Sequence, residues 1–242
     1  MAFTLGANWQ FEKNTGVFAR YSEGSKMPYF DDFRDNFGSY SNGNDLIFDV
    51  TQFELGYKLA ASNYNLYATG FYNEVESSQT PIPGGASNLF ATEAMGIELD
   101  AAYFTDGGFS ISLNATIQDS EVVESVDTTF IGNEAQRQPG FQLRVTPSYD
   151  IEMENFYATA YGTLSIVDDR FADPGNTVVL SGYETLDIGL TLANDSGLNM
   201  NLAIQNLTDE DALTEGDPRN PTAPNGRFIL PRTVTFSVGY SF

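Results

Sequence analysis

The sequence predicts an all-β fold, namely an antiparallel up-and-down transmembrane β-barrel portion of about eleven strands. Three observations predict it. Apolar and polar side chains alternate along many short runs, the connections between runs alternate between short and long, and aromatic residues gather near the short connections. Alternation with a period of two puts one kind of side chain on each face of a strand. In a membrane barrel the apolar face meets lipid and the polar face lines the lumen.

The last ten residues, 233–242, show the alternation most clearly, because every second residue is apolar and the chain stops on an aromatic. A strand of a soluble sandwich could have the same pattern, but chain ends fray unless they are tied down. The segment resembles the closing strand of bacterial outer-membrane barrels, whose terminal aromatic is read by the barrel-assembly machinery. The residues of this expected assembly signal are Val234, Phe236, Val238, Tyr240 and Phe242.

Composition narrows the class of protein. Of 242 residues, 41% are hydrophobic and 14% aromatic, which suits half-buried strands with interfacial rings better than a thick two-sided core. The chain has no cysteine and no histidine, which excludes disulfides, thiolate metal sites and imidazole chemistry. The formal net charge of -22 argues against nucleic acid as a partner, because phosphate recognition needs a basic patch.

Membrane and export signals of other kinds are not visible in the sequence. No window approaches the roughly 18 consecutive apolar residues of a transmembrane helix. The first ten residues lack the basic and apolar regions of a signal peptide. For a protein of the outer membrane this is a contradiction, and we expect that the natural N-terminal part is missing from this chain.

Eleven strand-like runs follow one another along the chain, separated by turn residues. Leu113 and Leu190 fall on apolar stripes of two such runs, and Asn114 falls on a polar stripe. Segments 67–71 and 157–161 fit either orientation. The expected strands are 3–11, 16–22, 48–59, 64–75, 92–104, 109–120, 141–150, 156–167, 184–193, 198–207 and 227–242.

The connections between these runs alternate in length. The short ones are rich in Gly, Asn, Asp and Ser, as hairpin turns are; they are 12–15, 60–63, 105–108, 151–155 and 194–197. The long ones exceed the usual hairpin length; they are 23–45, 77–88, 121–138, 168–182 and 209–226. Short turns on one side and long loops on the other are typical of an outer-membrane barrel.

Aromatic residues lie within a few residues of the short turns or of the C-terminus, as in the girdle at a membrane interface. They are Trp9, Phe11, Tyr57, Tyr64, Tyr103, Phe109, Tyr149, Phe156, Tyr240 and Phe242. If the C-terminus is periplasmic, eleven strands put the N-terminus outside the cell. Complete single-chain bacterial barrels have an even number of strands, so we expect a chain truncated at its N-terminus.

Several segments resemble the C-terminal half of the barrel of TonB-dependent outer-membrane receptors. Segment 182–190 resembles the family's tyrosine-led strand, 202–210 contains the Asn-Leu-Thr-Asp element, and 229–242 has Pro-Arg before the last strand. Upstream, 19–33 resembles the family segment in which a strand rises into a loop through Pro and aromatic residues. Gly96-Ile-Glu-Leu-Asp100 resembles a Gly-Val-Glu-Leu strand.

This resemblance implies a barrel of 22 strands around an N-terminal plug, of which residues 1–242 form one truncated barrel domain. It implies a receptor rather than an enzyme, energised uptake of a scarce ligand, and no cofactor. An iron–siderophore is the default ligand, with carbohydrate or cobalamin as alternatives. Outer-membrane lipid surrounds such a barrel, and the TonB complex acts through the N-terminal part. That part, the plug and the first strands are missing here, so we do not expect transport by this chain alone.

Two other classes of protein stay open at this point. A passive porin-like or adhesive outer-membrane barrel would have the same alternation without a plug. A soluble β-sandwich binding module would have similar strands, but it explains poorly why all the long loops lie on one side.

The candidate site residues are few. No catalytic constellation is visible, since histidine and cysteine are absent and no Ser-x-x-Lys spacing occurs. Asp168, Asp169 and Asp173 lack the Asp-x-Asp-x-Asp-Gly pattern of a calcium loop, so no metal site is predicted. The expected ligand contacts are the loop residues Tyr29, Phe30, Phe33 and Arg34. The expected lumen-facing charges are Glu54, Lys58 and Arg144.

Overall fold

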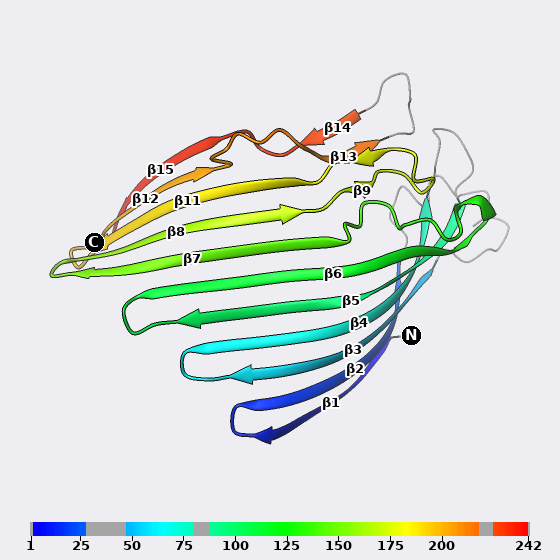
Figure 1. Ribbon diagram of the computed structural model, residues 1–242, viewed down its shortest axis with the longest axis horizontal. Helices are drawn as coiled ribbons and strands as arrows, with labels where there is room; N and C mark the ends of the chain where they lie inside the picture. The colour runs from blue at the N-terminus through cyan, green and yellow to red at the C-terminus, as the bar shows by residue number, and fades with distance from the viewer. Residues whose placement is uncertain (1, 28–46, 80–87, 218–224, 242) are drawn as a thin grey trace.

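The computed structural model describes residues 2–27, 47–79, 88–217 and 225–241. Its main feature is one antiparallel sheet of eleven strands in which each strand pairs with the next, which confirms the all-β prediction (Figure 1). β1 and β15 form its two edges. The strands are β1 (Phe3–Glu12), β2 (Thr15–Lys26), β3 (Phe48–Ala60), β4 (Tyr64–Gln79), β5 (Asn88–Phe104), β6 (Phe109–Ser125), β7 (Phe141–Met153), β8 (Phe156–Val167), β11 (Tyr183–Asn194), β12 (Leu198–Gln205) and β15 (Thr233–Tyr240).

The two ends of the sheet differ. Figure 1 shows the tight turns and the C-terminus at one end, called here the short-turn end, and the long connections at the other, the long-loop end. The described part of the chain contains no helix long and apolar enough to cross a membrane.

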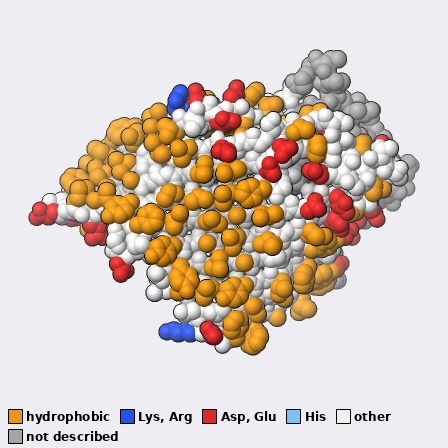
Figure 2. Space-filling view, viewed as in Figure 1, with side chains coloured by type: hydrophobic (Ala, Val, Ile, Leu, Met, Phe, Trp, Pro, Cys, Tyr) orange, Lys and Arg blue, Asp and Glu red, His pale blue; other side chains and the backbone are white. Residues whose placement is uncertain are grey.

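Cross-strand register keeps the apolar stripes aligned over the whole sheet. Leu190 lies opposite Leu202, which lies opposite Phe236, and Leu113 lies opposite Val145. Figure 2 shows hydrophobic side chains spread over this apolar face. Large side chains stay exposed across it, including Leu5, Leu55, Met95, Ile97, Ile117 and Phe236. A single-layer sheet cannot bury these groups itself, so water is an unfavourable solvent for this face.

The aromatic residues predicted for the girdle lie on this apolar face wherever they are described, which excludes only Phe242. Tyr103 is opposite Tyr64 and Ile111, and Tyr149 is opposite Phe109. The turns themselves are tight: Asn194 Oδ1 accepts hydrogen bonds from the backbone N–H groups of Ser196 and Leu198, at 3.1 and 2.9 Å. Gly197 follows with φ +93°, a conformation that favours glycine. Local turn chemistry thus fixes this end of the wall.

Register also settles the two segments that fitted either orientation. Tyr67 lies opposite Lys58, and Tyr161 lies opposite Gly189, so both rings are on the polar face. A Cβ atom added at Gly189 would lie 2.2 Å from Cζ of Tyr161. The glycine therefore leaves a slot that the ring fills, and the polar face carries aromatic surface as well as polar groups.

Most of the buried apolar side chains among the described residues lie at the long-loop end. Phe48 and Val122 are fully buried there, and Phe90 stacks on Phe130 with ring centroids 5.9 Å apart. This small core supports the long connections. Elsewhere the sheet is a single wall without a dry interior layer.

Some expected boundaries are wrong. Strands β2, β4, β5 and β6 run further toward the long-loop end than the sequence pattern predicts, because ladder pairing continues through polar residues. The expected strand 227–242 is interrupted. Its first part belongs to a separate hairpin, β13 (Leu213–Asp217) with β14 (Asn225–Phe228), and β15 begins only after Pro231, which has no N–H for a ladder.

The expected long loops also contain regular structure. Connection 168–182 contains a short hairpin, β9 (Arg170–Phe171) with β10 (Val179–Leu180), and connection 121–138 contains the 3-10 helix η1 (Thr128–Phe130). Alternating hydrophobicity is too weak over such short segments to reveal them.

Candidate functional site

The polar face carries the charged residues expected to face the lumen. Glu54 Oε1 forms an ion pair with Arg20 Nη2 at 2.5 Å and accepts a hydrogen bond from Gln52 Nε2 at 2.7 Å. Lys58 Nζ lies 4.5 Å from the centre of the Phe18 ring, a cation–π contact. Glu54 and Lys58 therefore take part in contacts between neighbouring strands of the wall.

Arg144 on β7 differs from these residues. It is exposed on the polar face opposite Asn114 and Ser165, and it has no hydrogen-bond or ion-pair partner among the described residues. The Asn114 amide donates instead to the Asp100 carboxylate. Arg144 is thus a cation available to a group outside the described part of the wall.

A cavity of about 420 Å³ opens on the polar face near the long-loop end. Side-chain amides line it: Gln52 of β3, Asn73 of β4, Gln118 of β6 and Gln138 of the β6–β7 connection. Gln118 Nε2 donates to the Pro139 carbonyl at 3.1 Å and contacts Gln138 Oε1 at 3.4 Å, which ties the connection to the wall.

Three long connections pack together at this end and form what we call the loop platform, residues 126–140, 168–182 and 206–232 as far as described. Asn176 holds two of them together, because its Oδ1 accepts from Glu134 N at 2.8 Å and its Nδ2 donates to Glu134 O at 3.0 Å. Arg137 N donates to Phe171 O at 2.7 Å. Asp127 caps η1, and hydrogen bonds from the Thr129 hydroxyl and backbone N–H lower its pKa.

Glu215 connects the platform through charge. Its carboxylate forms ion pairs with Arg137 at 2.9 Å and with Arg227 at 3.0 Å. Arg137 comes from the β6–β7 connection and the other two residues come from the β13–β14 hairpin, so the pairs join segments far apart in the sequence.

Arg170 is the buried cation of the platform, with only 6% of its surface exposed. Its Nη2 donates to the carbonyls of Leu213 at 3.3 Å and Thr214 at 2.8 Å, and its guanidinium lies 5.8 Å from the centre of the Tyr183 ring. Nη1 has no partner among the described residues. Arg170 thus holds the β9–β10 hairpin against β13.

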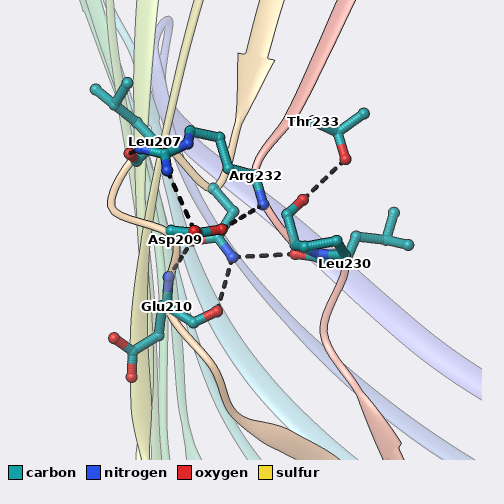
Figure 3. A network of polar contacts seen from close by, with 8 residues as sticks. Leu207, Asp209, Glu210, Leu230, Arg232 and Thr233 are labelled. Carbon is teal, nitrogen blue, oxygen red and sulfur yellow. Dashed lines mark hydrogen bonds and ion pairs between the residues drawn. The ribbon is translucent and has the colours of Figure 1, made fainter.

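A polar clamp joins the point where the chain leaves β12 to the point where it enters β15 (Figure 3). Asn206, 4% exposed, donates to the carbonyls of Glu210 at 2.8 Å and Leu230 at 3.0 Å, and accepts from Glu210 N at 2.8 Å. Asp209 accepts from Arg232 N at 2.9 Å and pairs with Arg232 Nη2 at 3.2 Å. Asn206 and Asp209 both have positive φ, which Asn and Asp tolerate better than most residues.

The acidic residues of the platform form no metal cage. Asp173 accepts from Thr177 N, Thr177 Oγ1 and Val178 N at 2.8–3.0 Å, so it organises the β9–β10 turn. Asp168 accepts from Asp169 N at 3.0 Å. Within the described ranges no group of three acidic side chains is arranged to hold a metal ion.

Of the remaining predicted site residues, some lie outside the described residues and the others lie on β15. Tyr29, Phe30, Phe33 and Arg34 lie outside the described residues, as does Phe242. Val234, Phe236, Val238 and Tyr240 form the expected stripe on β15, each between 55% and 64% exposed on the apolar face.

Comparison with known proteins identifies this architecture. The family model described as "TonB dependent receptor-like, beta-barrel" matches residues 2–207. The chain belongs to this family. Proteins of the family are outer-membrane receptors, and the eleven-stranded sheet is part of such a receptor barrel.

Individual relatives of the TonB-dependent receptor family agree. The chain is 29% identical over 137 residues to the ferrichrome receptor FcuA of Yersinia enterocolitica, which covers 51% of this chain and 18% of that receptor. Two solved structures share the fold with a TM-score of 0.78: the ferric yersiniabactin uptake receptor FyuA of Yersinia pestis and the ferric preacinetobactin receptor BauA of Acinetobacter baumannii. They are 20% and 19% identical over 97% and 99% of the chain, which spans 36% of each receptor.

Sequence reasoning found the TonB-dependent receptor motifs but not their structural role. The Asn-Leu-Thr-Asp and Pro-Arg elements meet in the clamp, and the Asn-x-x-Asp spacing with a later Pro-Arg was the only signal for it. Arg170, Asn73 and Gln118 carried no signal, because a single Arg, Asn or Gln in a strand or loop is common.

Proposed function

We propose that this chain is the C-terminal barrel part of an outer-membrane receptor that takes up a scarce ligand, first of all an iron–siderophore complex, with energy supplied through TonB. The observation that carries the proposal is a single sheet with an apolar face for lipid and a polar face that ends in a packed loop platform. A receptor needs both: a wall that spans the membrane and loops fixed on its outer rim.

The open edges of the sheet support a larger barrel. β1 and β15 each pair on one side only among the described strands. In lipid, unpaired backbone N–H and C=O groups cost several kcal/mol each, so a stable wall must close. We propose that residues 1–242 act as one barrel domain that closes against further strands around a plug, and that TonB acts through a segment before that plug.

The named relatives favour iron. The curated relative is a ferrichrome receptor and the two solved relatives are receptors for ferric siderophores. Carbohydrate and cobalamin are the alternatives. Tyr29, Phe30, Phe33 and Arg34 remain the proposed ligand contacts from the β2–β3 loop, and Arg144 is a free cation for the plug or ligand.

In this function the residues of the chain have separate tasks. The apolar face contacts outer-membrane lipid, and the β15 stripe is the proposed signal for the barrel-assembly machinery. The clamp and the contacts of Arg170 and Glu215 fix the platform in place. Ligand binding then costs less free energy for loop ordering, because the surface is pre-organised.

Uptake measurements test the proposal. A strain that lacks the gene should recover uptake of radioactive iron from ferric siderophores when the complete receptor is supplied, and a protonophore should abolish the recovery. Uptake of a glycan or of cobalamin instead would keep the receptor and exclude iron. Diffusive, energy-independent uptake of small solutes would contradict the proposal in favour of a porin-like barrel.

A further inference from the structure

The long-loop end of the molecule is strongly acidic. Its described carboxylates include Glu121, Glu124, Asp127, Glu134, Asp168, Asp169, Asp173, Asp209, Glu210, Asp211 and Glu215. The described cations of the loop platform are Arg137, Arg170, Arg227 and Arg232, and each is bound to a carboxylate or a carbonyl. Among the described residues of the platform little positive charge is left to attract an anion, and the summed field of the described charges repels one.

The amide-lined cavity at the same end has little charge of its own. Glu93 is the one charged residue among the described lining residues, and its carboxylate accepts a hydrogen bond from the Tyr72 hydroxyl at 2.8 Å. The Asn73 side chain has no hydrogen-bond partner among the described residues, and the Gln118 side chain bonds only through its amide nitrogen. The cavity therefore offers unused amide donors and acceptors.

Arg144 does not change this balance at the cavity. Asn114, its neighbour across the sheet, lies four residues from Gln118 along β6, roughly 13 Å toward the short-turn end. The Asn114 amide also holds the Asp100 carboxylate on the same row. The row also carries Lys58, so its two cations outnumber Asp100, but neither Lys58 nor Arg144 lines the cavity.

From these observations we propose that the amide-lined cavity is a ligand subsite that selects an uncharged or cationic ligand rich in amide, hydroxamate or hydroxyl groups and rejects polyanionic ligands. Asn73, Gln118 and Gln138 are its specificity-determining residues. The inference rests on the proposed receptor function and specifies the ligand class.

The physical reason is the match between amides and neutral polar groups. A side-chain amide both donates and accepts, so it pairs with carbonyls, hydroxyls and hydroxamates without a charge partner. A polyanion that enters the cavity meets no cation among its described lining residues, and its charge is both desolvated and repelled by the acidic rim. Discrimination thus comes from repulsion as well as attraction.

Binding to the purified complete receptor tests the inference. The probes are an uncharged ferric trihydroxamate, a cationic ferric trihydroxamate and a trianionic ferric tris-catecholate, with affinity measured by calorimetry at low and high salt. We expect the first two to bind at least 10-fold more tightly than the third at low salt. Equal or tighter binding of the tris-catecholate would overturn the inference.

Variants locate the subsite. Asn73→Ala and Gln118→Ala should each weaken binding of the uncharged trihydroxamate about 3- to 10-fold. Asn65→Ala is the matched control, since Asn65 lies on the same face of β4 near the short-turn end and should leave affinity unchanged. Heat-modifiable migration in gels confirms that each barrel is folded. Unchanged affinity in both cavity variants would overturn the assignment of these residues.

The same design separates this inference from the identity of the cargo. If no ferric complex binds, a neutral oligosaccharide and its sulfated form are compared in the same assay. Preference for the neutral form, lost in Asn73→Ala, supports the subsite while the iron assignment fails. Absence of any charge preference overturns the subsite itself.

Discussion

The side-chain hydrogen bonds inside the tight turns of the short-turn end join residues close in the sequence, whereas several side-chain hydrogen bonds of the long-loop end join residues far apart. Thr105 bonds with Phe109 and Asn194 with Leu198, each four positions away. At the other end, Asn133 reaches Pro174 across 41 positions and Arg137 reaches Gly216 across 79. The wall is thus specified by a local repeat and the loop platform by long-range polar contacts.

The two regions also differ in what stabilises them. In the proposed membrane barrel the wall relies on ladder pairing and on transfer of its apolar face into lipid, so its stability depends on the solvent around it. The platform has a small core and buried polar groups such as Asn206 and Arg170, so its stability depends on satisfied hydrogen bonds. Such a division suits a receptor, because loop sequences can change while the wall keeps its alternation of apolar and polar residues.

The largest loss of stability is expected from charges placed on the apolar face of the wall. Leu113→Arg and Leu190→Arg place a charge on the apolar face and should each lower the unfolding free energy in lipid vesicles by about 2–4 kcal/mol. The neighbouring changes Asn114→Arg and Thr191→Arg place the same charge on the polar face and should have small effects. Denaturant titrations monitored by fluorescence measure all four, and equal losses on both faces would show that the faces are wrongly assigned.

A smaller effect is expected in the clamp. Asn206→Ala removes three partly buried hydrogen bonds, which should cost about 1–3 kcal/mol. Hydrogen exchange should accelerate in residues 209–217 while β7 and β8 stay protected. Asn8→Ala is the control, since Asn8 is exposed on β1 and its side chain has no hydrogen-bond partner among the described residues. Unchanged exchange in the platform would rule out the clamp.

The smallest effect concerns the ion pairs of the platform. Glu215→Gln should cost about 0.5–1 kcal/mol at low salt, because the pairs with Arg137 and Arg227 are partly exposed. The loss should fade at high salt, as screening weakens the wild-type pairs. A loss of stability that does not depend on salt would mean that Glu215 acts through packing instead.

Most of the wall could be predicted from the sequence. Alternation predicted the eleven strands and their apolar stripes, since a period of two and turn residues are local properties. Tyr67 and Tyr161 could not be oriented, because their aromatic rings suit either face and only their cross-strand partners decide, Lys58 for Tyr67 and Gly189 for Tyr161. On the long-loop side the predicted strands were too short, because backbone pairing continues through segments whose polar composition favours a loop.

The candidate site was less accessible to sequence reasoning. The faces of Glu54, Lys58 and Arg144 follow from alternation, but the role of each depends on neighbours across the sheet, such as Arg20 and Phe18. The Asn206 clamp and the amide cavity require residues brought together by the whole topology. No local sequence pattern predicts these long-range contacts.

The most direct test of the account is a comparison of adjacent positions in lipid. Because residues 1–242 contain no native cysteine, single cysteines at 113, 114, 190 and 191 can each carry a spin label without background from this part of the receptor. In the complete receptor in vesicles, labels at 113 and 190 should be relaxed by oxygen from the lipid, and labels at 114 and 191 by a water-soluble nickel reagent. Equal accessibility of neighbouring positions to both reagents would contradict the division into a lipid face and a polar face.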